Sequence, residues 1–204
     1  MSLTKFVKIG SISNLSDARY CAGMMVDILG FEIANENSQH YVNPSTFQEL
    51  TEWVAGVSFA GECHNTTIDK LSQVIQKYQI QYIELNQLEI LKAFHDKTDK
   101  LFIFHYQFDG DLSKLKEVLE QADQYAEYII ITASDYSDVE AIDEVISRIS
   151  ISALLLRSYQ ITTSTVSQLS SNWHGIELKG TVEEKAGYKD YGMVMDILEA
   201  MEVD

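Results

Sequence analysis

Proline, cysteine and arginine are scarce in this chain, and each scarcity narrows what the protein is. The 204 residues include one proline, Pro44, and no glycine- or serine-rich stretch that would mark a linker. A chain of this length usually folds as one unit, so we expect a single domain over residues 1–204. The two cysteines, Cys21 and Cys63, are too few for a disulfide framework and indicate a reducing, cytoplasmic location.

Long hydrophobic runs are also missing. No segment approaches the ~18 apolar residues that a membrane span needs. Residues 1–5 lack the basic segment and hydrophobic stretch of a secretion signal. The hydrophobic content of 46% and the mean hydropathy of −0.10 are typical of an ordinary globular protein. We therefore expect no membrane partner.

Positive charge is in short supply. Thirty-one acidic residues against fifteen basic ones give a net charge of −16 and a pI near 4.6. The only arginines are Arg19, Arg148 and Arg157. Such a chain repels nucleic acid, so we expect no nucleic-acid partner. A small phosphorylated molecule stays open as a ligand, provided that a local cationic site or a helix N-terminus holds it against the overall field.

What the sequence does contain is an alternation of short apolar runs with amphipathic segments. Eight runs rich in β-branched or aromatic residues are each followed by a helical pattern, as buried parallel strands with crossover helices would be. They are Phe6–Ile9, Val26–Ile33, Val57–Ala60, Tyr82–Leu85, Leu101–Tyr106, Tyr128–Thr132, Ala153–Leu156 and Gly175–Leu178. Eight such repeats in about 200 residues predict an α/β fold, a (β/α)8 TIM barrel of minimal size. An open doubly wound sheet typically has fewer strands.

In such a barrel, chemistry takes place at the carboxyl ends of the strands and in the loops after them. After the last two predicted strands come Arg157, Ser158, Lys179, Gly180 and Thr181, where phosphate sites of such barrels usually lie. The two cations have a second interpretation, which is pairing with nearby carboxylates such as Glu177 or Glu183. The sequence leaves both open.

Two further groups at these positions are candidates for chemistry. Cys63 and His64 follow the third predicted strand, but neighbours on an extended segment point in opposite directions and do not form a nucleophile–base pair. Lys8, Glu84 and Glu177 stand inside apolar runs, which predicts an ion pair in a polar barrel interior. The five histidines are scattered without the spacing of a ligand set, so no metal site is expected.

Several motifs resemble those of phosphoribosylanthranilate isomerase, a single-domain barrel of tryptophan biosynthesis. Residues 8–18, KIGSISNLSDA, are similar to the family's K-I-C-G-[LI]-T-N-x-x-D-A, and residues 27–31, DILGF, to D-x-[LV]-G-F. Residues 38–44, SQHYVNP, are similar to S-x-R-x-[VI]-x-P. Residues 175–190, GIELKGTVEEKAGYKD, are similar to G-x-D-x-S-S-G-V-E-x-x-P-G-x-K-D.

The resemblance implies a reaction and a set of catalytic residues. This chain has other residues at the positions of the base and the acid. The family performs an Amadori rearrangement of an aminoaldose phosphate, with a cysteine as base and an aspartate as acid, and uses no cofactor. Gly10 stands at the base position and Thr132 at the acid position. His40 replaces the arginine that meets the substrate carboxylate. The phosphate-binding loops are replaced by residues 157–159 and 179–181.

We therefore expect an isomerase-like protein that is inactive or altered in the family reaction. A first alternative is a sugar-phosphate isomerase with replacement groups, Asp135 as acid and Cys63, His105 or Glu32 as base. A second is a non-catalytic binding or regulatory protein, which bulky side chains such as Tyr106 or Tyr159 in the mouth would favour. Residual family activity is a third. No oligomeric state follows from the sequence.

Overall fold

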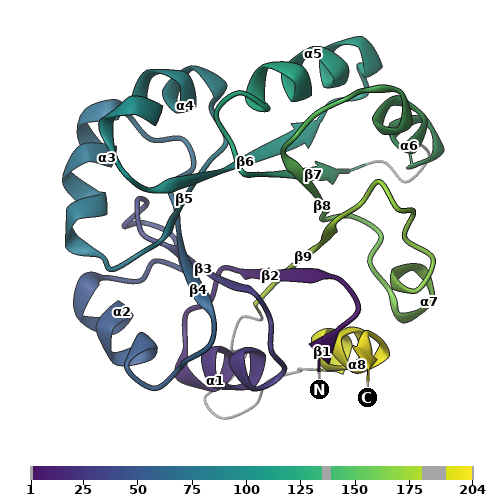
Figure 1. Cartoon of the computed structure of the whole chain (residues 1–204). Helices are drawn as coiled ribbons and strands as arrows, with labels where there is room; N and C mark the ends of the chain where they lie inside the picture. Colours follow the sequence, from purple (N-terminus) through teal and green to yellow (C-terminus); the bar gives the residue numbers. More distant parts are fainter. Residues whose placement is uncertain (1, 135–138, 181–191, 204) are drawn as a thin grey trace.

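The computed structural model describes residues 2–134, 139–180 and 192–203, and its strands close into the predicted barrel (Figure 1). Eight parallel strands pair in chain order, and the last returns to the first. They are β2 (Phe6–Gly10), β3 (Ile28–Glu32), β4 (Ser58–Glu62), β5 (Tyr82–Leu85), β6 (Leu101–Phe108), β7 (Tyr128–Ala133), β8 (Leu154–Arg157) and β9 (Gly175–Lys179). The (β/α)8 fold predicted from the apolar runs is confirmed.

Helices surround the strands on the outside (Figure 1). They are α1 (Leu15–Gly23), α2 (Pro44–Thr51), α3 (Ile68–Val74), α4 (Leu88–Phe94), α5 (Leu112–Ala122), α6 (Val139–Arg148), α7 (Thr163–Val166) and α8 (Gly192–Ala200), with short 3₁₀ turns at Ile75–Lys77 and His95–Lys97. Side-chain caps set several starts. The Asn14 amide oxygen accepts from the Asp17 backbone N–H, and Asn43 caps the helix that begins at Pro44.

A two-stranded antiparallel ribbon lies outside the barrel. β1 (Ser2–Leu3) pairs with β10 (Glu202–Val203), so the two ends of the chain lie side by side. The sequence analysis did not predict this pair, because two-residue strands leave no periodic pattern to detect.

Six strands end one or two residues later than their apolar runs indicated, and three of these extensions bear on the site. β4 ends at Glu62 rather than Ala60, β6 at Phe108 rather than Tyr106, and β9 at Lys179 rather than Leu178. Apart from Phe108, the extra residues of these three strands are polar or glycine, which weakens the sequence signal of a strand. The correction matters because it places Glu62, Gln107 and Lys179 on the barrel wall.

Side chains alternate between the helix layer and the barrel interior along each strand. In β2, Val7 and Ile9 belong to the outer core, and Lys8 lies between them on the inner face. The inner face is apolar toward the amino ends of the strands, where Ile28, Ala60, Ile103, Tyr128, Ile130 and Leu156 form a separate cluster. Toward the carboxyl ends it is charged, and the candidate site lies there.

Candidate functional site

The centre of the charged half is the Lys8 ammonium group, which three carboxylates surround. Its Nζ lies 2.8 Å from Glu62 Oε1, 2.7 Å from Glu84 Oε2 and 2.7 Å from Glu177 Oε1. The four residues come from β2, β4, β5 and β9, and all are buried. The predicted pairing of Lys8 with Glu84 and Glu177 is confirmed, whereas Glu62 was missed as a partner.

Mutual attraction keeps these groups ionised despite burial. Burial would lower the pKa of Lys8, but Glu177, Glu62 and Glu84 together raise it well above its usual range. Burial would raise the pKa of Glu177, but Lys8 and then Lys179 lower it to about 2. Burial opposes ionisation of Glu84 as well, and Lys8 and the two histidines beside it lower its pKa. Lys8, Glu84 and Glu177 are therefore charged at neutral pH.

Two glycines make room for the Glu62 carboxylate. A Cβ atom on Gly10 would lie 2.6 Å from Glu62 Oε1, and one on Gly30 would lie 2.3 Å from the same atom. The carboxylate also accepts hydrogen bonds from the Ser11 backbone N–H, at 3.2 Å to Oε1 and 3.1 Å to Oε2. Because Gly10 has no side chain, the Glu62 side chain from β4 can lie directly against the backbone of β2.

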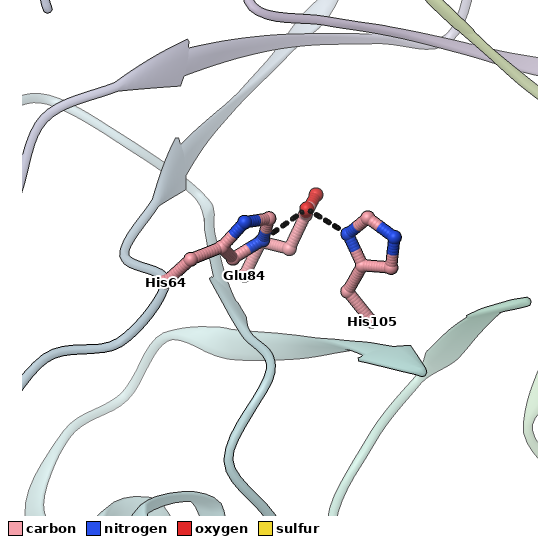
Figure 2. Close-up of side chains that lie close together, drawn as sticks. All are labelled: His64, Glu84 and His105. Atoms are coloured by element: carbon pink, nitrogen blue, oxygen red, sulfur yellow. Dashed lines mark hydrogen bonds and ion pairs between the residues drawn. The ribbon is translucent and has the colours of Figure 1, made fainter. Parts of the chain in front are cut away.

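Glu84 is shared with two histidines (Figure 2). Its Oε1 lies 2.7 Å from His64 Nε2 and 3.2 Å from His105 Nδ1. His64 and His105 keep 28% and 13% of their side-chain surface exposed, so both reach the open end of the barrel. Burial would lower the pKa of His64, but Glu84 and Glu62 raise it.

The histidines are scattered along the sequence, but His64 and His105 meet in the fold. They are 41 residues apart in the chain, and three neighbouring strands bring them to one carboxylate. A signal for this was present. Counting by two from Ala60 places Glu62 and His64 on the interior side of β4 and its extension.

Thr132 extends this network but supplies no acid. Its Oγ1 lies 3.3 Å from His105 Nε2, 2.8 Å from Gln107 Oε1 and 3.3 Å from the carbonyl oxygen of Tyr106. A threonine hydroxyl donates hydrogen bonds but does not ionise near neutral pH. Thr132, at the position that the resemblance assigns to the acid, therefore takes part in this network as a hydrogen-bonding group.

Ser158, Lys179 and Gly180 line the same end of the barrel. Ser158 Oγ donates to Glu177 Oε2 at 2.7 Å, and Lys179 Nζ donates to Glu177 Oε1 at 3.1 Å. The pairing of Lys179 with Glu177 follows one of the two interpretations left open above, although 43% of the Lys179 side chain stays exposed. The Gly180 N–H donates to the Gly10 carbonyl oxygen, so that amide is already occupied. Thr181, Glu183 and Asp135 lie outside the described residues.

Arg157 follows neither interpretation. Alternation along β8 turns its side chain outward, while Leu156 and Ser158 face the interior. The guanidinium stacks 4.6 Å from the centre of the Tyr159 ring, and its Nε donates to the Tyr159 carbonyl oxygen at 3.0 Å. This buried position, away from the mouth, speaks against a role in holding phosphate.

Cys63 also faces outward, on the side opposite His64, and the two side chains point in opposite directions as predicted. Its side chain is fully buried in the core between barrel and helices. Burial raises the pKa of the thiol, and Glu84 and Glu62 raise it further. The arrangement argues against Cys63 as a replacement base.

The remaining two candidates lie in or near the loop after β3. Glu32 Oε2 accepts from Ser38 Oγ at 2.6 Å. The His40 backbone N–H donates to Ser38 Oγ at 3.1 Å, and its ring lies beside the Gln39 amide. Glu32 pairs with Glu62 through the backbone of β3 and β4, but within the described ranges neither the Glu32 nor the His40 side chain hydrogen-bonds to the Lys8 cluster.

A separate cavity of about 620 Å³ opens at the opposite end of the barrel. It is lined by residues that precede the strands, among them Lys5, Asp27 and His174. Catalytic residues of such barrels lie at the carboxyl ends of the strands, and the other face serves stability. We therefore place the candidate site among Lys8, Glu62, Glu84, Glu177 and the two histidines.

No helix among the described residues is long and apolar enough to cross a membrane.

Comparison with known proteins supports the fold. No protein-family model and no curated protein matches the chain. Among solved structures, phosphoribosylanthranilate isomerase from Thermotoga maritima is 19% identical, with coverage of 97% of this chain and 98% of the other, at a TM-score of 0.74. The Pyrococcus furiosus N-(5'-phosphoribosyl)anthranilate isomerase is 15% identical, with 97% and 98% coverage and a TM-score of 0.72.

The fold is also similar to that of an enzyme that is not an isomerase by name. A phospho-2-dehydro-3-deoxyheptonate aldolase from Thermotoga maritima is 13% identical, with coverage of 98% of this chain and 68% of the other, at a TM-score of 0.69. Identities this low establish architecture and leave activity to be argued from the site. The chain has the barrel fold of the phosphoribosylanthranilate isomerases, as its motifs implied.

Proposed function

We propose that this protein acts on a small phosphorylated sugar at the carboxyl end of its barrel, by chemistry other than the isomerisation of N-(5'-phosphoribosyl)anthranilate. One observation carries the proposal: the Glu62 carboxylate fills the space that a side chain on residue 10 would need. Glu62 is one of the three carboxylates around Lys8, so a charged group takes up the space beside position 10.

The loss of the family reaction follows from both proton-transfer positions. Gly10 has no side chain to accept a proton, and Thr132 has no group that ionises near neutral pH. Positioned general acids and bases each contribute roughly 10²–10⁴ in rate. Without both, turnover of N-(5'-phosphoribosyl)anthranilate should fall by at least ~10⁴ from an ordinary enzyme rate.

Two features support ligand binding at the carboxyl end of the barrel: polar and charged side chains face the mouth, and two bulky tyrosines do not. The exposed Lys179 ammonium supplies a cation at the end of β9, where phosphate sites of such barrels usually lie. His64 and His105 supply groups that can act on a ligand. Tyr106 and Tyr159 pack outward in the helix layer, so these two bulky side chains do not fill the mouth. That arrangement favours a binding site over a filled, non-catalytic barrel.

Two measurements on the purified chain test the proposal. The first follows consumption of N-(5'-phosphoribosyl)anthranilate, and turnover at an ordinary ~1–10³ s⁻¹ would overturn it. The second measures binding of aldose and ketose phosphates by calorimetry. We expect at least one to bind, and Lys179→Met to weaken it by about tenfold or more.

Lys97→Met is the matched control for the binding measurement. Lys97 is an exposed lysine before β6, at the opposite end of the barrel, and its loss should leave binding unchanged. If no sugar phosphate binds, the proposed ligand class is wrong, and if both variants bind one equally well, Lys179 does not hold the ligand.

A further inference from the structure

We infer that His64, Glu84 and His105 form a binding site for one divalent transition metal ion. They offer two imidazole nitrogens and one carboxylate oxygen, from β4's extension, β5 and β6 (Figure 2). This donor set suits zinc, cobalt, iron or manganese, whereas calcium and magnesium favour oxygen ligands. The site rests on the proposed function only in that the metal would face the same ligand.

The spacing of the donor atoms fits a metal. Ions of this class bind imidazole nitrogen and carboxylate oxygen at about 2.0–2.2 Å, so two ligands at right angles lie ~3 Å apart. The distances from Glu84 Oε1 to His64 Nε2 and His105 Nδ1 are 2.7 and 3.2 Å. Small side-chain rotations would therefore replace two hydrogen bonds by three bonds to an ion.

The hydrogen bonds around Thr132 give an independent argument. The hydroxyl has one proton, and two acceptors, Gln107 Oε1 and the Tyr106 carbonyl oxygen, lie within reach of it. When Thr132 donates to either, its oxygen accepts from His105 Nε2–H. In the His105 tautomer with its proton on Nε2, the ring donates to Thr132 and leaves the lone pair of Nδ1 available to a metal ion, in place of the hydrogen bond that Nδ1 makes with Glu84 in the other tautomer.

The surroundings have the features of a metal site. The bond from His105 Nε2 to Thr132 fixes the ring with Nδ1 toward the metal position, as outer partners of metal-bound histidines do. The Lys8 ammonium pairs with Glu84 Oε2, so Oε1 is the oxygen of this carboxylate that can bind the metal ion. Both histidines are partly exposed, so the remaining coordination positions face the mouth, as in sites that bind substrate.

A metal would also correct the charge of the mouth. Glu62, Glu84 and Glu177 against Lys8 and Lys179 leave one net negative charge, which repels a phosphorylated ligand. A divalent ion would make this sum positive. The three carboxylates of Glu62, Glu84 and Glu177 also lie close enough together to bind a metal ion. They do not need one, because the Lys8 ammonium already lies between them.

The test uses the full chain, treated with a chelator and titrated with Co²⁺ and Zn²⁺ without any sugar phosphate. We expect one ion per chain, visible absorption bands from bound Co²⁺, and at least about 100-fold weaker binding in His64→Ala and in His105→Ala. Thr132→Val should weaken binding about tenfold, since it removes the partner of His105 Nε2.

His95→Ala is the control, because His95 also lies beside a carboxylate, 3.0 Å from Asp96 Oδ1, but on an exposed turn. Circular dichroism checks that each variant is folded. Absence of stoichiometric binding, or equal affinity in the wild type and both site variants, would overturn the metal site. Neither result decides whether a sugar phosphate binds, which the calorimetry with Lys179→Met measures separately.

Discussion

The Glu62 carboxylate and the backbone of Gly10 occupy one space, since a Cβ atom on residue 10 would lie 2.6 Å from Glu62 Oε1. The two residues are 52 positions apart and meet because β2 and β4 face the same interior. A side chain at position 10 would therefore have to displace the Glu62 carboxylate from its place in the charged cluster.

Gly10→Ala should destabilise the protein. The added methyl would displace a carboxylate that Lys8 and the Ser11 N–H hold, and overpacking of this kind costs about 1–3 kcal/mol. The measurement is the free energy of unfolding in urea. Gly23→Ala is the control, since a Cβ there meets nothing within 4 Å and alanine favours the helix.

A double-mutant cycle makes the prediction specific. In a Glu62→Ala background the space beside Gly10 is vacated, so Gly10→Ala should cost clearly less than in the wild type. An equal cost in both backgrounds would contradict the steric account. On the same reasoning, Gly10→Cys with Thr132→Asp should fail to restore isomerase activity while Glu62 is in place.

Lys8→Met should cost about 3–5 kcal/mol, because it leaves three buried carboxylates without their shared cation. Lys114→Met removes a lysine of similar length from an exposed pair with Asp109 and should leave stability unchanged. Urea unfolding of both variants checks this. If Lys8→Met is no less stable than Lys114→Met, the cluster is not what holds this end of the barrel.

The eight strands could be predicted because each contains a continuous apolar run. The opposite directions of the Cys63 and His64 side chains followed from the period of two along an extended segment. The polar ends of the strands could not be predicted equally well. Gly61 and Glu62 weaken the strand signal, and only the closed interior, with Lys8 opposite, makes an ionised glutamate acceptable there.

The convergence of distant residues was beyond the sequence for a different reason. His64 and His105 meet through the stagger of β4, β5 and β6, which fixes how far each strand reaches toward the mouth. Spacing along one chain carries no information on that stagger. Arg157 shows the converse: it comes at the end of β8, as a phosphate ligand would, but alternation turns it to the helix layer.

Acid should weaken the protein through Glu177. Its pKa falls from about 4.5 to about 2 on folding, so the folded state favours the ionised form. The stabilisation is fully present above pH ~4.5 and is lost as the pH falls toward ~2. The difference in unfolding free energy between wild type and Glu177→Gln should therefore shrink over this range.

Glu89→Gln serves as the control for this titration, since the Glu89 side chain is 87% exposed on α4. The difference in unfolding free energy between Glu89→Gln and the wild type should change little between pH 5 and 2.5, because solvent screens an exposed charge. A constant difference for Glu177→Gln as well would show that folding does not lower the pKa of Glu177.

The Cys63 thiol should be unreactive in the folded protein. Its side chain is fully buried, and burial with Glu84 and Glu62 raises its pKa, so almost no thiolate exists at neutral pH. In a Cys21→Ala background, a thiol reagent should label no cysteine in the native state and one after denaturation. Adding Ser134→Cys supplies an exposed thiol beside the mouth that should react at once. If Cys63 reacts as fast as that reporter, its thiol reaches solvent, and its candidacy as the base of a sugar-phosphate isomerase reopens.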